Sequence, residues 1–427
     1  MFSNRLPSTL ATNRLTATLD RLRREGRRVR DLTVSNPTHA ALDYAPDLLS
    51  PLADVRGLVY RPHPLGLESA RVAVAADYAR RGLSVAPDRI VLASSTSEAY
   101  SLLFKTLCDP GDEVLVPEPS YPLFEQLTRL DAIVAVPYEL EYHGTWQVNL
   151  DSLRRGLAPR SKAVVAVSPN NPTGSYVKQA ELAEIESVCA NHDLAVIVDE
   201  VFADYELEAG AASRAGRPLE CREALACSLG GLSKSIGLPQ AKLAWMALAG
   251  PEPVVADALT RLEYVADAYL SVSTPVQASA ADLMAAGAAV RSAIRQRLDK
   301  NLGALKDAVQ GVPACRVLHV EGGWSAVLQV PTLSTEEDLV LDLLTRDGIL
   351  VHPGYFFDFP SGSFLVVSLL TPCAEFAEGV GDILVRFASS ASLSASTDSI
   401  TPPSPAGPLS LVPPALPAPP ASADPEP

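Results

Sequence analysis

Three short segments of the sequence carry side chains that could do chemistry together. Residues 168–174 read SPNNPTG, residues 198–202 read VDEVF and residues 232–235 read LSKS, each following or ending a short apolar run. They supply an amide, a carboxylate and an amine: Asn171, Asp199 and Lys234. A lysine amine can form a Schiff base with an aldehyde, and an acid can pair with a pyridinium nitrogen. The segments therefore indicate the protein half of a pyridoxal phosphate (PLP) site.

Each segment alone also has an ordinary structural explanation. Asn-Pro-Thr-Gly makes a good strand-to-helix turn, because Pro fixes one dihedral and Gly supplies a positive one. An Asp-Glu pair can end a strand at the surface, and Ser-Lys pairs are common. The order of the three segments, each beside a strand-like run, favours the PLP interpretation over coincidence.

Further motifs support a family resemblance. Residues 60–66 read YRPHPLG, residues 93–99 read ASSTSEA, residues 109–122 read DPGDEVLVPEPSYP and residues 352–354 read HPG. With the three segments above, they make the chain resemble the class I and II aminotransferases, the fold-type I PLP enzymes, from about residue 31 to about residue 387. The resemblance implies an α/β fold in which a large domain with a mostly parallel sheet joins a smaller α/β domain.

The resemblance also implies a role for each residue around the cofactor ring. Lys234 would form the Schiff base and then move a proton between substrate and cofactor. Asp199 would keep the ring nitrogen protonated. Tyr121 would stack on the ring, with a core tyrosine as the alternative. Asn171 would donate to the phenolic oxygen, and Phe202 stands where most relatives place a tyrosine that does the same.

The phosphate and the substrate need their own partners. Thr96 and Ser97 open a predicted helix, whose N-terminal amides favour an anion. Lys242 stands where relatives usually have an arginine that binds the phosphate. A lysine offers positive charge there but not the planar, bidentate guanidinium group. Tyr60 would reach the phosphate from the neighbouring subunit of a homodimer. Asn36 would face the substrate, an amino donor or a keto acid acceptor in ping-pong transamination. For Tyr60 and Asn36, a loop or turn role is the alternative.

One departure from the family pattern bears on the reaction. Val366 stands where relatives commonly carry an arginine that clamps the substrate α-carboxylate. Losing such a charge-assisted hydrogen bond removes roughly 1.5–3 kcal/mol of binding. Either another cation replaces it, with Arg14 and Arg61 as candidates, or the substrate is not an ordinary α-amino acid. A PLP-dependent lyase or decarboxylase on the same fold therefore stays open as the alternative to an aminotransferase. Gly231 also stands where many relatives place a phosphate-binding serine.

The elements that must position these residues can be read from the apolar runs. Residues 89–92, 113–116, 133–136, 163–167, 194–198, 224–227 and 243–248 are continuous apolar stretches, as in strands buried on both faces. Helical segments lie between them, such as residues 98–107 and 178–191, and a long one covers about 274–309. Alternating strands and helices predict a mostly parallel sheet, whose ligands bind at the carboxyl ends of its strands.

The predicted organisation has four parts. Residues 1–45 form an N-terminal arm that completes the small domain, residues 46–272 the large PLP-binding domain, and residues 273–388 the C-terminal small domain. Residues 389–427 are mostly Pro, Ala and Ser, and such a composition predicts a disordered tail.

Composition narrows the function classes. The net charge of −15 among 427 residues argues against nucleic acid as a partner, and no apolar stretch is long enough to span a bilayer. The six cysteines are scattered without CxxC spacing, and the six histidines lack ligand spacing, so no metal site is expected. Reduced thiols and the lack of a secretory apolar region predict a cytoplasmic protein.

Overall fold

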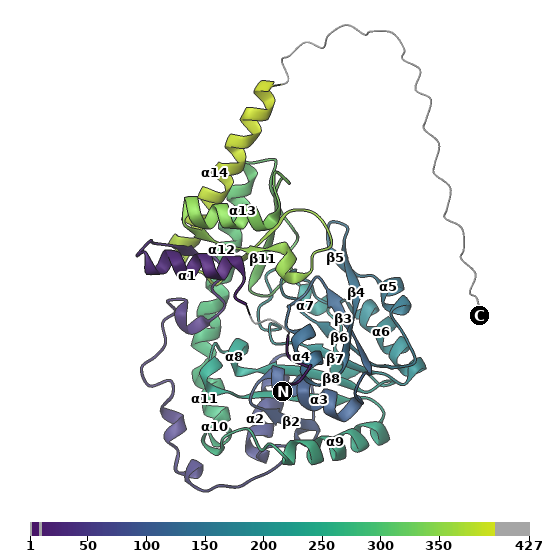
Figure 1. Cartoon of the computed structure of the whole chain (residues 1–427). Coiled ribbons are helices and arrows are strands. Elements are labelled where there is room, and N and C mark those ends of the chain that lie inside the picture. Colours follow the sequence, from purple (N-terminus) through teal and green to yellow (C-terminus); the bar gives the residue numbers. More distant parts are fainter. Residues whose placement is uncertain (1, 8–10, 398–427) are drawn as a thin grey trace, which may run out of the picture.

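A computed structural model describes residues 2–7 and 11–397 of the chain (Figure 1). Its centre is an eight-stranded sheet with strand order β2-β9-β8-β7-β6-β3-β4-β5. β4, β3, β6, β7 and β8 pair in parallel, whereas β9 runs antiparallel to β8 and β2, and β5 antiparallel to β4. The strands are Ile90–Ala93 (β2), Glu113–Glu118 (β3), Val134–Tyr142 (β4), Trp146–Val148 (β5), Ser161–Val167 (β6), Ala195–Asp199 (β7), Ala226–Gly231 (β8) and Ala244–Ala249 (β9). The prediction of a mostly parallel sheet is confirmed.

The central strands β6, β7 and β8 are buried on both faces, which explains why they are almost free of charged residues. Along β6, Val165 packs into one core with α3 (Thr96–Leu107), α4 (Phe124–Leu130) and α9 (Glu252–Asp267). Its neighbour Val164 packs into a second core, on the other face, with α5 (Leu150–Arg155) and α6 (Gln179–His192). Successive side chains of a strand point to opposite faces, so a strand covered on both sides needs no polar positions.

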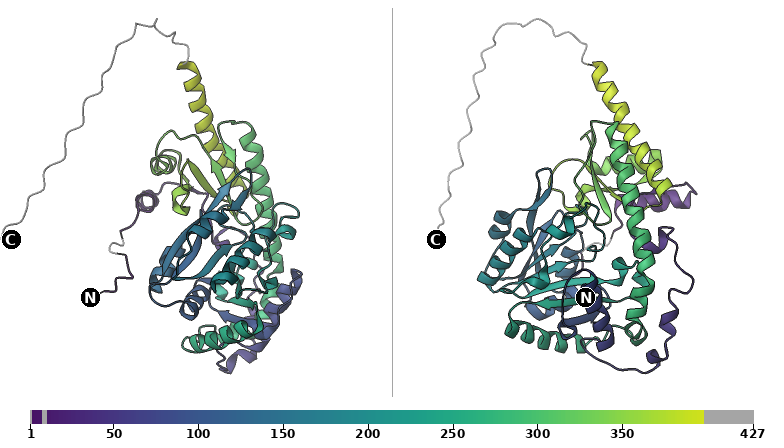
Figure 2. Two further views of the ribbon diagram at one scale, coloured as in Figure 1. Left: turned by 90° about the vertical axis from the view of Figure 1, so that its right-hand side faces the viewer. Right: turned by 180° about the vertical axis from the view of Figure 1, so that it is seen from behind.

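The smaller domain sits at one end of the large sheet (Figures 1 and 2). Its antiparallel sheet has the order β10-β11-β14-β13. The strands are Arg316–Val317 (β10), Ser325–Gln329 (β11), His352–Pro353 (β13) and Phe364–Ser368 (β14). Two helices complete the domain, Glu336–Asp342 (α13) and Cys373–Thr397 (α14).

The N-terminal arm packs on the small domain. It contains α1 (Arg14–Arg24) and β1 (Arg30–Asp31), and β1 pairs in parallel with β12 (Ile349–Leu350). Beyond β1, the amide of Leu32 donates to Leu350 at 2.9 Å, and its carbonyl accepts from the amide of Ser368 at 2.7 Å. Residues more than 300 positions apart thus form one unit.

The connection between the domains differs from the sequence-based expectation. The single long helix predicted over about 274–309 is three helices, Thr274–Ala278 (α10), Ala280–Ala286 (α11) and Ala288–Gln310 (α12). Gly287 lies between α11 and α12 because the chain approaches Ile236 closely there; an added Cβ would lie 2.6 Å from that side chain. α11 packs on α2 (Glu68–Arg80), and α12 packs on α14.

The C-terminal helix also extends beyond residue 389, where the tail was predicted to start. α14 runs to Thr397, so residues 389–397 are helical and do not belong to an irregular tail. The rest of the predicted tail, residues 398–427, lies outside the described part of the chain. None of the helices within the described residues is long and apolar enough to cross a membrane.

Leu32 offers a test of how the arm is held. Its side chain is fully buried and lies against Gly379 of α14. We expect Leu32→Ala to lower the free energy of unfolding by about 2–5 kcal/mol in urea denaturation, since a buried leucine leaves a cavity. Leu333→Ala, at a leucine that is 64% exposed, is the control and should change it by less than about 0.5 kcal/mol. Equal effects of the two substitutions would contradict this packing.

Candidate active site

A cavity of about 360 Å³ lies between the two domains. The large domain supplies the ends of several strands, the small domain supplies residues of β11, β13 and β14, and the N-terminal arm supplies two residues just after β1. The lining includes Thr33, Ser35, Thr96, Ser97, Tyr100, Tyr121, Asn171, Asp199, Phe202, Lys234, Trp324, Ser325, His352, Val366 and Ser368. The cavity therefore requires both domains and the arm.

The topology of the sheet explains why three chemical groups meet here. Asp199 is the last residue of β7, Asn171 follows the end of β6, and Lys234 lies in the short helix α8 (Leu232–Ser235) directly after β8. These strands are parallel neighbours, with Val167 of β6 opposite Asp199. Their carboxyl ends consequently meet at one edge of the sheet, as the sequence predicted.

Asp199 is a partly buried carboxylate in the cavity wall with two neutral donors. The Tyr100 hydroxyl donates to its Oδ2 at 3.2 Å, and the amide of Val201 donates to its Oδ1 at 3.0 Å. Burial nevertheless raises the pKa of Asp199 to about 6, since the charged form has lost its water and these donors and Lys234 compensate only in part. The site thus holds an acid that lacks a close cationic partner.

Lys234 is the matching buried amine. Burial lowers the pKa of its ammonium group, and the charge of Asp199 opposes this shift. Its Nζ lies 5.0 Å from the ring centre of Trp324 and 5.9 Å from that of Phe202. The Tyr205 hydroxyl fixes the backbone by donating to the Lys234 carbonyl at 2.6 Å. A larger neutral fraction makes the amine a better nucleophile.

A helix N-terminus supplies the other end of the cavity. α3 begins at Thr96, and the Ser95 side chain caps it by accepting from the amide of Glu98 at 3.1 Å. Thr96 and Ser97 both line the cavity, so the first-turn amides and two hydroxyls lie beside it. The free amides and the helix dipole make such a position favourable for an anion.

The remaining predicted residues divide into two groups. Tyr121, Asn171 and Phe202 line the cavity with Lys234 and Asp199. Phe202 packs on Trp324 with ring centres 5.4 Å apart, and Ser325 donates to Asn171 Oδ1 at 3.2 Å. The second group does not line the cavity of the described chain: Asn36, Tyr60 and Lys242.

The surroundings of that second group are distinct. Asn36 is exposed and caps a turn by accepting from the amide of Thr38 at 3.1 Å. Tyr60 is 70% exposed and lies beside Arg61 and Tyr269 in a separate small pocket. Lys242 is exposed in a left-handed backbone conformation, φ 53°. Their roles at the cofactor or substrate remain predictions.

The small-domain residues of the cavity were missed by the sequence reasoning. Trp324, Ser325, His352 and Ser368 all line it, although only Val366 of this sheet had been connected to the site. The alternation of Val366 and Ser368 along one strand was a usable signal, since both must share a face.

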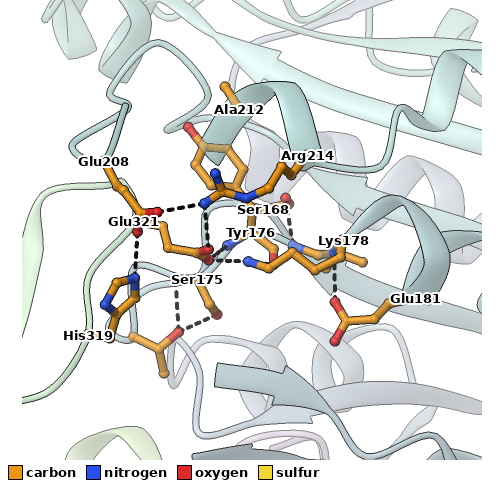
Figure 3. A network of polar contacts seen from close by, with 12 residues as sticks. Ser168, Ser175, Tyr176, Lys178, Glu181, Glu208, Ala212, Arg214, His319 and Glu321 are labelled. Atoms are coloured by element: carbon orange, nitrogen blue, oxygen red, sulfur yellow. Dashed lines mark hydrogen bonds and ion pairs between the residues drawn. The ribbon is translucent and has the colours of Figure 1, made fainter. Parts of the chain in front are cut away.

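An ion network holds the loop that leads into Trp324 (Figure 3). Glu321, 3% exposed, contacts Lys178 through a very short hydrogen bond and lies 3.8 Å from Arg214. Glu208 pairs with Arg214 at 2.7 Å and with His319 at 2.5 Å. Although Glu208, His319 and Glu321 lie close enough for a metal ion, two cations already contact this group. The network joins the large domain to the loop before β11.

Comparisons with known proteins agree with this geometry. The family model for aminotransferase class I and II matches residues 31–372. A glutamate-pyruvate aminotransferase of Escherichia coli K12, AlaA, is 29% identical over 364 residues, covering 82% of this chain and 88% of AlaA. An alanine aminotransferase of Mycobacterium tuberculosis is 26% identical, covering 86% and 88%. The solved alanine aminotransferase of Pyrococcus furiosus superposes with a TM-score of 0.81 at 23% identity, covering 90% and 100%.

The buried acid predicts a pH-dependent stability. Because the folded protein raises the pKa of Asp199 from 3.8 to about 6, ionisation opposes folding above that range. In ligand-free protein, we expect Asp199→Asn to raise the free energy of unfolding by up to about 3 kcal/mol at pH 8. The gain should shrink as the pH falls through 6 and vanish near 4.

Urea denaturation across this pH range measures the effect. Asp299→Asn, at an exposed carboxylate on α12, is the matched control and should show no such trend. A destabilising Asp199→Asn at pH 8 would contradict the assignment of an uncompensated buried charge.

Proposed function

Because the chain belongs to the class I and II aminotransferases, we propose how its own residues carry out PLP-dependent amino-group transfer. The chemistry of the donor set supports PLP as the cofactor of this cavity. Desolvation raises the pKa of the Asp199 carboxyl, and the charge of Lys234 offsets this only in part, so a pyridinium nitrogen would stabilise its charged form. Lys234 is a buried amine facing the same cavity. When bound, PLP supplies a ring that accepts the electron pair left at the substrate carbon.

Each residue then has a defined task. Lys234 Nζ would hold the cofactor covalently and would move the proton of the substrate carbon, for which its lowered pKa is suited. Asp199 would hold a proton at the ring nitrogen. Asn171 would bind the phenolic oxygen, with Phe202 beside it offering no hydroxyl. Tyr121 would cover the ring and keep water away from it.

The phosphate would be held by Thr96 and Ser97 at the start of α3. This proposal is supported by their position at the cavity and by the favourable dipole of the helix. Lys242 would add a positive charge, which requires its flexible side chain to turn towards the phosphate. Because the Lys242 side chain is exposed, this movement would not disturb the packing of the core.

A homodimer would complete the site with Tyr60 of the second copy. The segment before α2 runs along the outside of the molecule (Figure 1). It exposes several large apolar side chains: Val55 75%, Leu58 84%, Val59 52% and Tyr60 70%. A row of this kind is typical of a protein–protein interface. A two-fold interface there would bury the row and leave Tyr60 of each copy available to its neighbour's site.

The substrates would be an amino donor and a keto acid acceptor used in alternation. The relatives AlaA, a glutamate-pyruvate aminotransferase, and the alanine aminotransferase support small amino acids. Asn36 would approach the substrate only if the arm moves, because its side chain caps a turn outside the cavity. A cytoplasmic location is supported by the six cysteines, all free thiols.

The covalent role of Lys234 predicts a labelling result. Borohydride treatment of the PLP-loaded protein should attach the cofactor permanently, and peptide mapping should find it on Lys234. Lys234→Ala should lose both the attachment and measurable transamination. Lys162→Ala, at a partly buried lysine of β6 outside the cavity, should retain both. Recovery of the label on another lysine would refute the proposed role.

The dimer proposal predicts a change in assembly. We expect the protein to sediment as a dimer, and Leu58→Asp to shift it to a monomer with little transamination, because the charge would be buried in the interface. Leu333→Asp, at a leucine that is also exposed but lies in the small domain, should sediment like the unaltered protein. An active monomer at assay concentration would exclude any role of Tyr60 across subunits.

A further inference from the structure

The small-domain sheet presents one neutral face to the cavity. Val366 of β14 pairs directly with His352 of β13, and two residues further along β14 Ser368 pairs with Ser325 of β11. Directly opposed residues of an antiparallel pair share a face, and all four side chains line the cavity. We call these four residues the cavity roof. It lies where the family's arginine would stand, and it contains no guanidinium.

Most polar groups of the roof are already engaged. The Ser368 hydroxyl donates to the carbonyl of Val34 at 2.5 Å, and the Ser325 hydroxyl donates to Asn171 Oδ1 at 3.2 Å. His352 differs, because its Nδ1 is buried and has no hydrogen-bond partner among the described residues. The imidazole is therefore the roof's uncommitted polar group, and it faces a cavity large enough for a substrate.

The imidazole is neutral and can donate one hydrogen bond. Burial lowers the pKa of His352, against the opposing charge of Asp31. Its ring packs beside Phe356 and Phe357, with centres 5.8 and 5.9 Å away. Buried N–H groups are left without a partner more rarely than buried lone pairs are. We therefore assign the lone pair to the unpartnered Nδ1 of His352 and the proton to Nε2. Nε2 is then the nitrogen that can donate to a ligand.

We propose that His352 is a specificity-determining residue: its neutral N–H donates to an oxygen of the carboxylate or carboxamide group attached to the substrate's α-carbon, so that amino amides are accepted about as well as amino acids. This inference rests on the proposed transamination in the same cavity. A guanidinium favours a carboxylate over a neutral amide because the bond is charge-assisted, by a factor of roughly ten to a hundred. A neutral donor gains less from the carboxylate's charge than a guanidinium does. An uncharged roof also leaves the larger desolvation cost of the carboxylate uncompensated by a counter-ion, and this removes most of that preference.

Within one copy of the chain, neither candidate arginine supplies a cation to the cavity. Arg14 is exposed and paired with Glu337 at 2.7 Å, and Arg61 lies in the separate pocket beside Tyr60. Neither lines the cavity within the described residues. The apolar contacts of the roof, Val366 and the nearby Phe357, likewise suit an uncharged group better than a bare carboxylate.

The test compares a carboxylate with its amide on the PLP-loaded protein. L-Lactate and L-lactamide carry a hydroxyl in place of the amine and cannot be transaminated, so calorimetric titration at pH 8 measures binding alone. We expect dissociation constants within about threefold of each other. Val366→Arg, if it folds, should shift the ratio at least about tenfold towards L-lactate.

Two variants of His352 locate the donor. His352→Phe keeps a ring but no N–H and should weaken both ligands alike, by about three- to tenfold. His352→Gln keeps a donor and should restore most of the binding. Thermal unfolding and PLP absorbance of each variant check that fold and cofactor are retained.

Other outcomes would overturn the inference. L-Lactate binding more than about thirtyfold tighter than L-lactamide, with the same ratio in His352→Phe, would show that a cation elsewhere reads the substrate. Undetectable binding of both ligands to PLP-loaded protein would also refute a donor at His352. If the protein never retained PLP, the proposed function itself would be refuted. PLP absorbance would show this independently of the ligand titration.

Discussion

The structure depends most on keeping one carboxylate and one amine buried at the same edge of a sheet. Neither group is stable there alone: burial raises the pKa of Asp199 to about 6 and lowers that of Lys234. Each opposes the other's shift only in part, so burying both groups is electrostatically costly. A cofactor with a cationic ring nitrogen and an aldehyde would match both groups at once. Under the proposed function, binding of PLP would offset this cost.

The parallel sheet makes this arrangement possible, and the small domain makes it selective. β6, β7 and β8 bring Asn171, Asp199 and Lys234 to one edge. Backbone hydrogen bonds join Leu32 of the N-terminal arm to β12 and β14. The ion pairs of Glu321 join the loop before β11 to the large domain. Both attachments fix the four residues of the cavity roof. Under the proposed roles, the large domain would carry the chemistry and the small domain the selectivity.

The sequence predicted the large domain well because its signals are local. Continuous apolar runs placed β6 and β7 correctly, and Asn171 and Asp199 lie at the carboxyl ends of these two strands. The break before α12 was not predictable, since Gly287 is needed for a contact with Ile236, which lies far away in the chain. Of the cavity roof, only Val366 was connected to the site from the sequence, and the other three residues were missed for the same reason. Which face of β14 meets the cavity depends on its register with β11 and β13, and no local pattern near His352 or Ser325 reveals that register.

The account is tested most directly by a crystal structure of the protein with PLP. It predicts continuous electron density from Lys234 Nζ to the cofactor. It also predicts the Asp199 carboxylate within hydrogen-bonding distance of the ring nitrogen and the phosphate at the start of α3. Cofactor density at another lysine, or a ring nitrogen without contact to Asp199, would contradict the claim that these two buried groups exist for this ligand.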